Sequence, residues 1–109
     1  MTQATIYIVD EHESVRSALA ERLGHASDLR VIGHSGEPAV VIADVRKEKP
    51  SIVLLEVKRK DGMGLEILRQ LATLPIPPRL AVLTSYPTEW EEEAATRAGA
   101  EIYLLKDID

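Results

Sequence analysis

The chain has 109 residues, which is long enough for one domain with one core and too short for two. Its 45% apolar and 28% charged content is that of a soluble globular protein, and no apolar run approaches the ~20 residues that a membrane span needs. The net charge of -5 provides no broad basic surface, which argues against direct nucleic-acid binding.

Cysteine is absent from the sequence, which excludes disulfides, thiolate metal sites and cysteine nucleophiles. The first residues, MTQATIYIVD, lack the basic start and the cleavage site of a signal peptide. We therefore expect a cytoplasmic protein with no membrane partner.

Five short runs rich in β-branched residues predict strands, because segments of helical period separate them. The predicted strands are residues 4–9, 29–34, 51–55, 79–84 and 101–105. The first, third and fourth are almost wholly apolar, as expected for central strands that helices cover on both faces.

Four helices are predicted between these strands. The first carries an apolar stripe from Val15 to Leu23, and we expect Gly24 to end it in a left-handed conformation. The second should begin near Pro38, because proline is favoured in a first helical turn, and end near Glu48.

The third and fourth helices have equally clear signals. Leucines 65, 68 and 71 form the stripe of the third helix. Thr88 and Glu91 have the spacing of a capping box that opens the fourth helix, and Gly99 should close it. The alternation predicts an α/β fold: a flavodoxin-like doubly wound sandwich with a five-stranded parallel sheet in the order 2-1-3-4-5.

Such sheets bind ligands beyond the carboxyl ends of their strands, where several polar residues of this chain are expected to meet. These are Asp10, Glu11, Glu56, Thr84, Ser85 and Lys106. Each alone would be an ordinary turn or cap residue. Together, three carboxylates with two hydroxyls and one ammonium indicate a site, and oxygen ligands without His or Cys suit Mg²⁺.

Three segments resemble the receiver domain of two-component response regulators of the NarL/FixJ type, which has a CheY-like fold. They are IYIVDEHESVRSAL, then IVLLEVKRKDGMGLEILRQL, and AVLTSY followed by AGAEIYLLKD. The resemblance covers nearly the whole chain. It implies that residues 1–109 are a single receiver domain, cut before the fifth helix that the family has, so that one face of the sheet would be exposed.

The resemblance also implies roles for individual residues. Asp10 and Glu11 match the Mg²⁺-binding acidic pair, the Lys58 carbonyl is a further metal ligand, and Glu56 stands at the phosphoacceptor position and in the metal site. Thr84 and Lys106 would contact the phosphoryl oxygens, and Tyr103 would be the switch aromatic that turns inward on activation.

The same resemblance implies partners. We expect a sensor histidine kinase or a small phosphodonor, and a homodimer or output-domain contact through the fourth helix and fifth strand. A DNA-binding output domain would follow Asp109. The receiver itself would not be an enzyme beyond its own phosphorylation and autodephosphorylation.

Glu56 departs from the family's aspartate by one methylene, which moves the carboxylate by about 1.5 Å. An error of about 1 Å can cost on the order of a hundredfold in rate. One hypothesis is therefore a pseudo-receiver in which Glu56 partly imitates a phosphoryl group; the alternative is a phosphoacceptor that uses Glu56. A flavodoxin-like binder of small ligands is a remote third hypothesis, because no glycine-rich phosphate loop follows the first strand.

The basic run Lys58, Arg59 and Lys60 is a second departure, with Lys60 in place of the family's proline. We expect a solvated loop. Alternatively, these charges pair with the acidic cluster and weaken or replace the metal. Around the fourth helix, the run of glutamates from Glu89 to Glu93 suits the positive end of a helix dipole, and Trp90 either faces a partner or caps the core.

Overall fold

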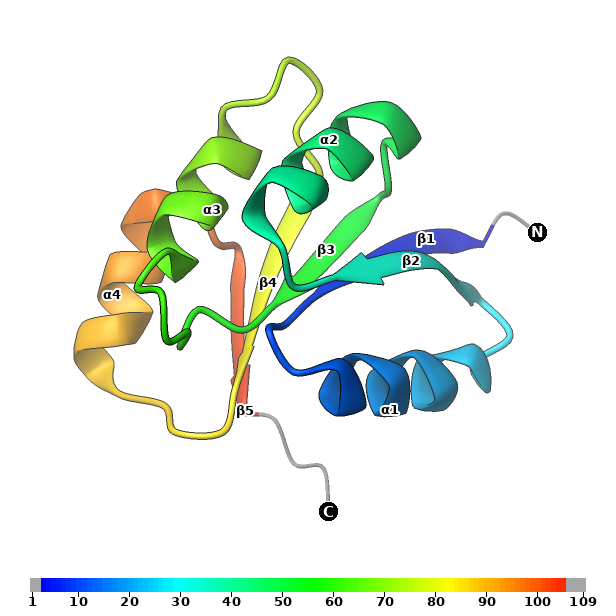
Figure 1. Ribbon diagram of the computed structural model, residues 1–109, viewed down its shortest axis with the longest axis horizontal. Helices are drawn as coiled ribbons and strands as arrows, with labels where there is room; N and C mark the ends of the chain where they lie inside the picture. The colour runs from blue at the N-terminus through cyan, green and yellow to red at the C-terminus, as the bar shows by residue number, and fades with distance from the viewer. Residues whose placement is uncertain (1–2, 106–109) are drawn as a thin grey trace.

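The computed structural model describes residues 3–105, which form a parallel five-stranded sheet with helices on both faces (Figure 1). The strands are β1 (Ala4–Val9), β2 (Leu29–Ser35), β3 (Ile52–Leu55), β4 (Arg79–Thr84) and β5 (Ile102–Leu105). Their order across the sheet is β2-β1-β3-β4-β5, as predicted, so the three most apolar strands are central. Across residues 3–105, no helix has the length and apolar character to cross a membrane.

The four helices are α1 (Glu13–Gly24), α2 (Pro38–Glu48), α3 (Gly64–Ala72) and α4 (Glu89–Ala98). Figure 1 shows α1 on one face of the sheet and α2, α3 and α4 on the other. Pro38 opens α2 and Gly99, with φ of 124°, follows α4, as the sequence predicted. The prediction for Gly24 was wrong: it is the last residue of α1, and the cap residue His25 is right-handed.

Alternating side chains divide the core into two clusters. Tyr7, Val53 and Val82 point toward α2, α3 and α4, where they meet buried residues such as Leu68. Ile6 and Ile8 belong to the smaller cluster beneath α1. Because neighbouring residues of a strand face opposite sides of the sheet, β1, β3 and β4 contribute to both clusters.

The smaller cluster is covered incompletely at the β5 edge. Leu104 pairs in register with Leu83, and Ile102 with Ala81, so these side chains share the face on which α1 lies. Ile102 and Leu104 are each 46% exposed. Among residues 3–105 no helix beyond α4 is present, in keeping with the expectation of an exposed sheet face.

Candidate functional site

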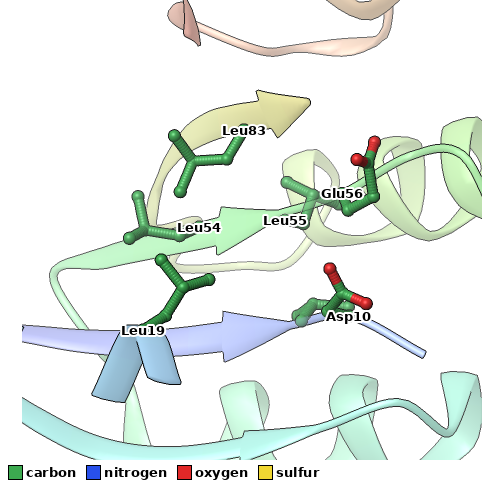
Figure 2. Close-up of a pocket in the computed structure, with 7 residues that line it drawn as sticks. Asp10, Leu19, Leu54, Leu55, Glu56 and Leu83 are labelled. Carbon is green, nitrogen blue, oxygen red and sulfur yellow. The ribbon is translucent and has the colours of Figure 1, made fainter. Parts of the chain in front are cut away.

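The central strands bring three buried polar side chains to one edge of the sheet. Asp10 follows β1, Glu56 follows β3 and Thr84 ends β4, and they are 1%, 8% and 0% exposed. Figure 2 shows the carboxylates of Asp10 and Glu56 at the ends of adjacent strands, beside a hollow lined largely by leucines. The Glu56 N–H donates to the Val9 carbonyl at 3.0 Å, which fixes the two strand ends together. Lys106 lies outside the described residues.

Asp10 turns back toward the start of α1. Its Oδ1 accepts a hydrogen bond from the His12 backbone N–H at 2.9 Å and lies 3.2 Å from His12 Nδ1. His12 is therefore a site neighbour, and its position two residues past Asp10 was the only signal for it in the sequence.

Glu11 reaches from the β1–α1 loop to the β3–α3 loop. The Lys60 backbone N–H donates to both carboxylate oxygens of Glu11, at 3.1 and 3.2 Å. Lys60 therefore contributes its main chain to the site, while the residue itself is exposed. Over residues 3–105, no three acidic or histidine side chains are grouped so that they could hold a metal ion together.

Glu56 is held by its own loop. Its Oε2 accepts the Lys58 backbone N–H at 3.1 Å, so the side chain folds back over the two residues that follow it. Asp10 makes the same kind of bond to the N–H two residues after it. The buried Glu56 carboxylate thus has a defined position, and its bond to the Lys58 N–H directs it along its own loop.

The Lys58 side chain crosses to the β4–α4 region. Its Nζ donates to the Tyr86 carbonyl at 2.6 Å and to Glu91 Oε2 at 2.5 Å, and it lies 3.5 Å from Thr84 Oγ1. Thr84 Oγ1 also accepts the Tyr86 backbone N–H at 3.3 Å. One ammonium group therefore connects the loop after Glu56 with the end of β4 and with α4.

Glu91 is the far end of this connection and is only 7% exposed. Its other oxygen, Oε1, accepts the Tyr103 hydroxyl at 2.5 Å, and that hydroxyl accepts the Thr88 backbone N–H at 3.3 Å. Half of the expected capping box is present, since Thr88 Oγ1 accepts the Glu91 N–H at 3.1 Å. The reciprocal bond from the Thr88 N–H goes to Tyr103, because the Glu91 carboxylate points into the interior.

Tyr103 is half-buried on β5 and packs against the larger core cluster. Burial and the hydrogen bond to Glu91 raise the pKa of the Tyr103 hydroxyl to about 12. The ring thus packs against the core and its hydroxyl is neutral at physiological pH, while a switch role for Tyr103 stays a prediction.

Arg59 contradicts the expectation of a solvated basic loop. Its side chain is only 3% exposed. Nη2 donates to the Gly36 carbonyl at 2.6 Å and to Asp61 Oδ2 at 2.9 Å, and Nε donates to Asp61 Oδ1 at 3.0 Å. Within the described residues, Arg59 Nη1 is buried without a hydrogen-bond partner.

The sequence therefore missed three contributions: the Lys58 side chain, the buried Arg59 and the inward Glu91. In the sequence these residues belong to a run of charges or to a pattern that complements a helix dipole, and the side chains of such residues are usually solvated. Two other candidates lie outside the site, because Ser85 is exposed and Trp90 is 69% exposed. Trp90 thus does not cap the core.

A family model settles what this arrangement belongs to, because the response regulator receiver domain matches residues 6–109. The chain is a receiver domain of the response regulator family. Receiver domains of this family generally bind Mg²⁺ at their phosphorylation site and interact with histidine kinases and output domains.

Curated relatives are response regulators, one of which is named a DNA-binding transcriptional activator. The chain is 37% identical over 103 residues to the DNA-binding transcriptional activator DevR/DosR of Mycobacterium tuberculosis, covering 94% of this chain and 48% of the relative. It is 30% identical over 108 residues to the nitrate/nitrite response regulator NarL of Escherichia coli, covering 97% of this chain and 49% of that protein. The receiver thus spans about half the length of these relatives.

Solved structures agree on the fold. The receiver domain of a response regulator named NarL from Mycobacterium tuberculosis has a TM-score of 0.89 at 18% identity, covering all of this chain and 88% of that one. At this identity the likeness concerns the fold alone. It supports the doubly wound, CheY-like arrangement of β1 to β5.

Proposed function

We propose that this receiver domain is a pseudo-receiver, which adopts its signalling conformation without transfer of a phosphoryl group to Glu56. The observation that carries the proposal is the connection from Thr84 through Lys58 and Glu91 to Tyr103. In the family, the switch hydroxyl and the aromatic respond to a phosphoryl group. Here an ammonium and a carboxylate from the chain itself make the link.

The position of Glu56 supports the same function. A nucleophile must lie in line with the group it attacks, and an error of about 1 Å can cost on the order of a hundredfold in rate. The Glu56 carboxylate is longer than aspartate and is bonded back to the Lys58 N–H. It supplies a fixed negative charge at the strand end, where an acyl phosphate would carry ~-1.5 to -2.

A resident divalent metal fits the described side chains poorly. Mg²⁺ demands near-octahedral oxygen ligands, often one or two carboxylates with several waters. Both carboxylate oxygens of Glu11 instead accept the Lys60 N–H. The buried guanidinium of Arg59 lies on the same loop as Lys60. The metal ligands expected from the resemblance, Asp10, Glu11, Glu56 and the Lys58 carbonyl, stay a prediction, and the mechanism proposed here uses no metal.

The surface that would pass the signal to a partner lies next to Tyr103. Its hydroxyl fixes the first turn of α4 through Thr88 and Glu91, so the α4 and β5 surface is presented in one arrangement. We propose that this surface contacts an output domain or a second receiver in a cytoplasmic regulator. The name of the relative DevR/DosR supports a DNA-binding output domain, and membership of the receiver family supports a sensor histidine kinase upstream.

A second candidate function is an active phosphoacceptor that uses Glu56 and hydrolyses its own acyl phosphate. It is favoured by the retention of Asp10 and Thr84, both fully buried at the site. The two functions differ in whether a covalent adduct forms.

Incubation with acetyl phosphate and Mg²⁺, followed by intact-protein mass spectrometry, separates them. We expect no phosphoryl adduct on the wild-type chain and unchanged NMR signals of Tyr103 and Trp90. The neutral Glu56→Gln variant should shift the Tyr103 signal, because it removes the charge and keeps the length. A stable adduct on Glu56 would overturn the proposal, and an adduct only in Glu56→Asp would assign the loss to the extra methylene.

A further inference from the structure

The buried guanidinium of Arg59 is not accounted for by the signalling connection described above. Its Nη2 donates to the Gly36 carbonyl of the β2–α2 loop, whereas the Lys58 side chain reaches Glu91 on α4. A charged side chain that is only 3% exposed is rare, because burial of an ion is unfavourable unless the ion is paired. Its charge therefore requires a compensating group.

Gly36 places this guanidinium next to the β1–α1 loop, which carries the acidic pair. A Cβ built on Gly36 would lie 2.7 Å from the Asp10 carbonyl oxygen and 2.9 Å from Glu11 Cα, so Gly36 packs directly on the β1–α1 loop. Arg59 thus contacts a residue that touches both acidic positions. The Lys60 N–H, one residue further, bonds the Glu11 carboxylate itself.

Asp61, the ion-pair partner of Arg59, accepts hydrogen bonds from only two of the three guanidinium nitrogens. Asp61 pairs with Nε and Nη2 but is 39% exposed, so solvent weakens its interaction. Nη1 stays buried without a partner among residues 3–105. The hydrogen bond with Asp61 raises the pKa of Arg59, and the charges of Glu11 and Asp10 raise it further.

We propose that the Arg59 guanidinium takes the charge-balancing role of a divalent cation at this site, so that Asp10 and Glu11 are neutralised by the chain itself. A guanidinium spreads one positive charge over a planar group with five donors, and it cannot lose its proton at physiological pH. It is therefore a permanent substitute. The inference deepens the proposed function, but it concerns only the acidic pair and holds whether or not Glu56 accepts a phosphoryl group.

Calorimetric titration with Mg²⁺ alone tests the substitution. We expect no saturable binding to the wild-type chain at millimolar Mg²⁺, and binding at least about tenfold tighter in Arg59→Met, a variant of similar length without the charge. The control Arg69→Met removes an arginine that is 65% exposed on α3, and it should behave as the wild type. Saturable Mg²⁺ binding by the wild-type chain in the sub-millimolar range would overturn the inference.

A second measurement keeps the test valid if Arg59→Met folds poorly. Glu11→Gln should lower the melting temperature of the wild-type chain, because it removes a counter-charge of Arg59 and keeps the acceptor for the Lys60 N–H. In Arg59→Lys, which keeps the positive charge, Glu11→Gln should again lower the melting temperature; in Arg59→Met, where the two acids repel without a counter-charge, it should raise it. An increase on Glu11→Gln in the wild type would contradict the inference. Neither readout involves phosphorylation.

Discussion

The Tyr103 hydroxyl donates to Glu91 Oε1 at 2.5 Å, and this bond joins β5 to the first turn of α4. The same carboxylate accepts Lys58 Nζ at 2.5 Å, so one buried group holds a strand, a helix and the loop after Glu56. Charge-assisted hydrogen bonds of this kind are about twice as strong as neutral ones. The arrangement makes Glu91 the residue whose replacement should affect Tyr103 most directly.

Replacement of Glu91 by glutamine should lower the pKa of Tyr103 from about 12 toward its ordinary value, because the negative acceptor becomes neutral. The loss of charge-assisted bonds should also reduce the free energy of unfolding by roughly 2 kcal/mol. Titration of tyrosinate absorbance and urea denaturation measure the two effects. Glu92→Gln, an exposed change on the same helix, is the matched control and should alter neither quantity. An unchanged Tyr103 pKa in Glu91→Gln would refute the link.

Alkaline pH should destabilise the fold through its tyrosines. Burial and the Asp44 contact raise the pKa of Tyr7, and burial and the Glu91 contact raise that of Tyr103. A raised folded-state pKa means that the unfolded chain loses its protons first, so stability is full below the unfolded pKa of about 10 and falls as the pH rises toward about 12. Melting temperatures across this window should fall in the wild type and fall less in Tyr103→Phe. Equal slopes would mean that Tyr103 does not contribute.

Gly64 should tolerate no side chain. A Cβ at this position would lie 1.9 Å from the Val57 carbonyl oxygen, so Gly64→Ala must displace the β3–α3 loop that carries Lys58. We expect a loss of at least about 1–3 kcal/mol, the usual cost of overpacking. Gly24→Ala is the control, because nothing lies within 4 Å of its Cβ and alanine favours a helix, so it should stabilise by about 0.5–1 kcal/mol. Similar unfolding midpoints for the two variants would contradict the geometry.

Truncation of a leucine should reduce the free energy of unfolding more on the covered face of the sheet than on the exposed face. Leu68 on α3 is fully buried, and Leu68→Ala should cost about 2–5 kcal/mol. Leu104 is 46% exposed, so Leu104→Ala should cost less than about 1 kcal/mol in the same chain. Guanidinium denaturation of both variants provides the comparison. If Leu104→Ala were as costly as Leu68→Ala, the β5 edge would be covered in solution.

Most of the fold could be predicted from the sequence, because periodicity and turn residues act locally. Runs of β-branched residues located all five strands to within a residue or so, and Pro38 and Gly99 marked helix ends correctly. The cap at Gly24 failed because nothing in the local sequence says whether a terminal glycine lies just inside or just outside a helix.

The site was predictable only in part. Strand topology placed Asp10, Glu56 and Thr84 together, since carboxyl ends of parallel strands meet at one edge. Long side chains were not predictable in the same way. Arg59 and Lys58 leave one loop in different directions, toward Gly36 and Glu91, and only the three-dimensional arrangement of the surrounding loops decides which of the two is buried.

Positions 56, 58 and 59 lie on one loop, and the side chain at each has its own hydrogen-bond partner. Glu56 accepts the Lys58 backbone N–H, Lys58 donates to Glu91, and Arg59 donates to the Gly36 carbonyl. Substitutions among connected residues are not additive, so the effects of replacements at positions 56, 58 and 59 on the free energy of unfolding should depend on one another.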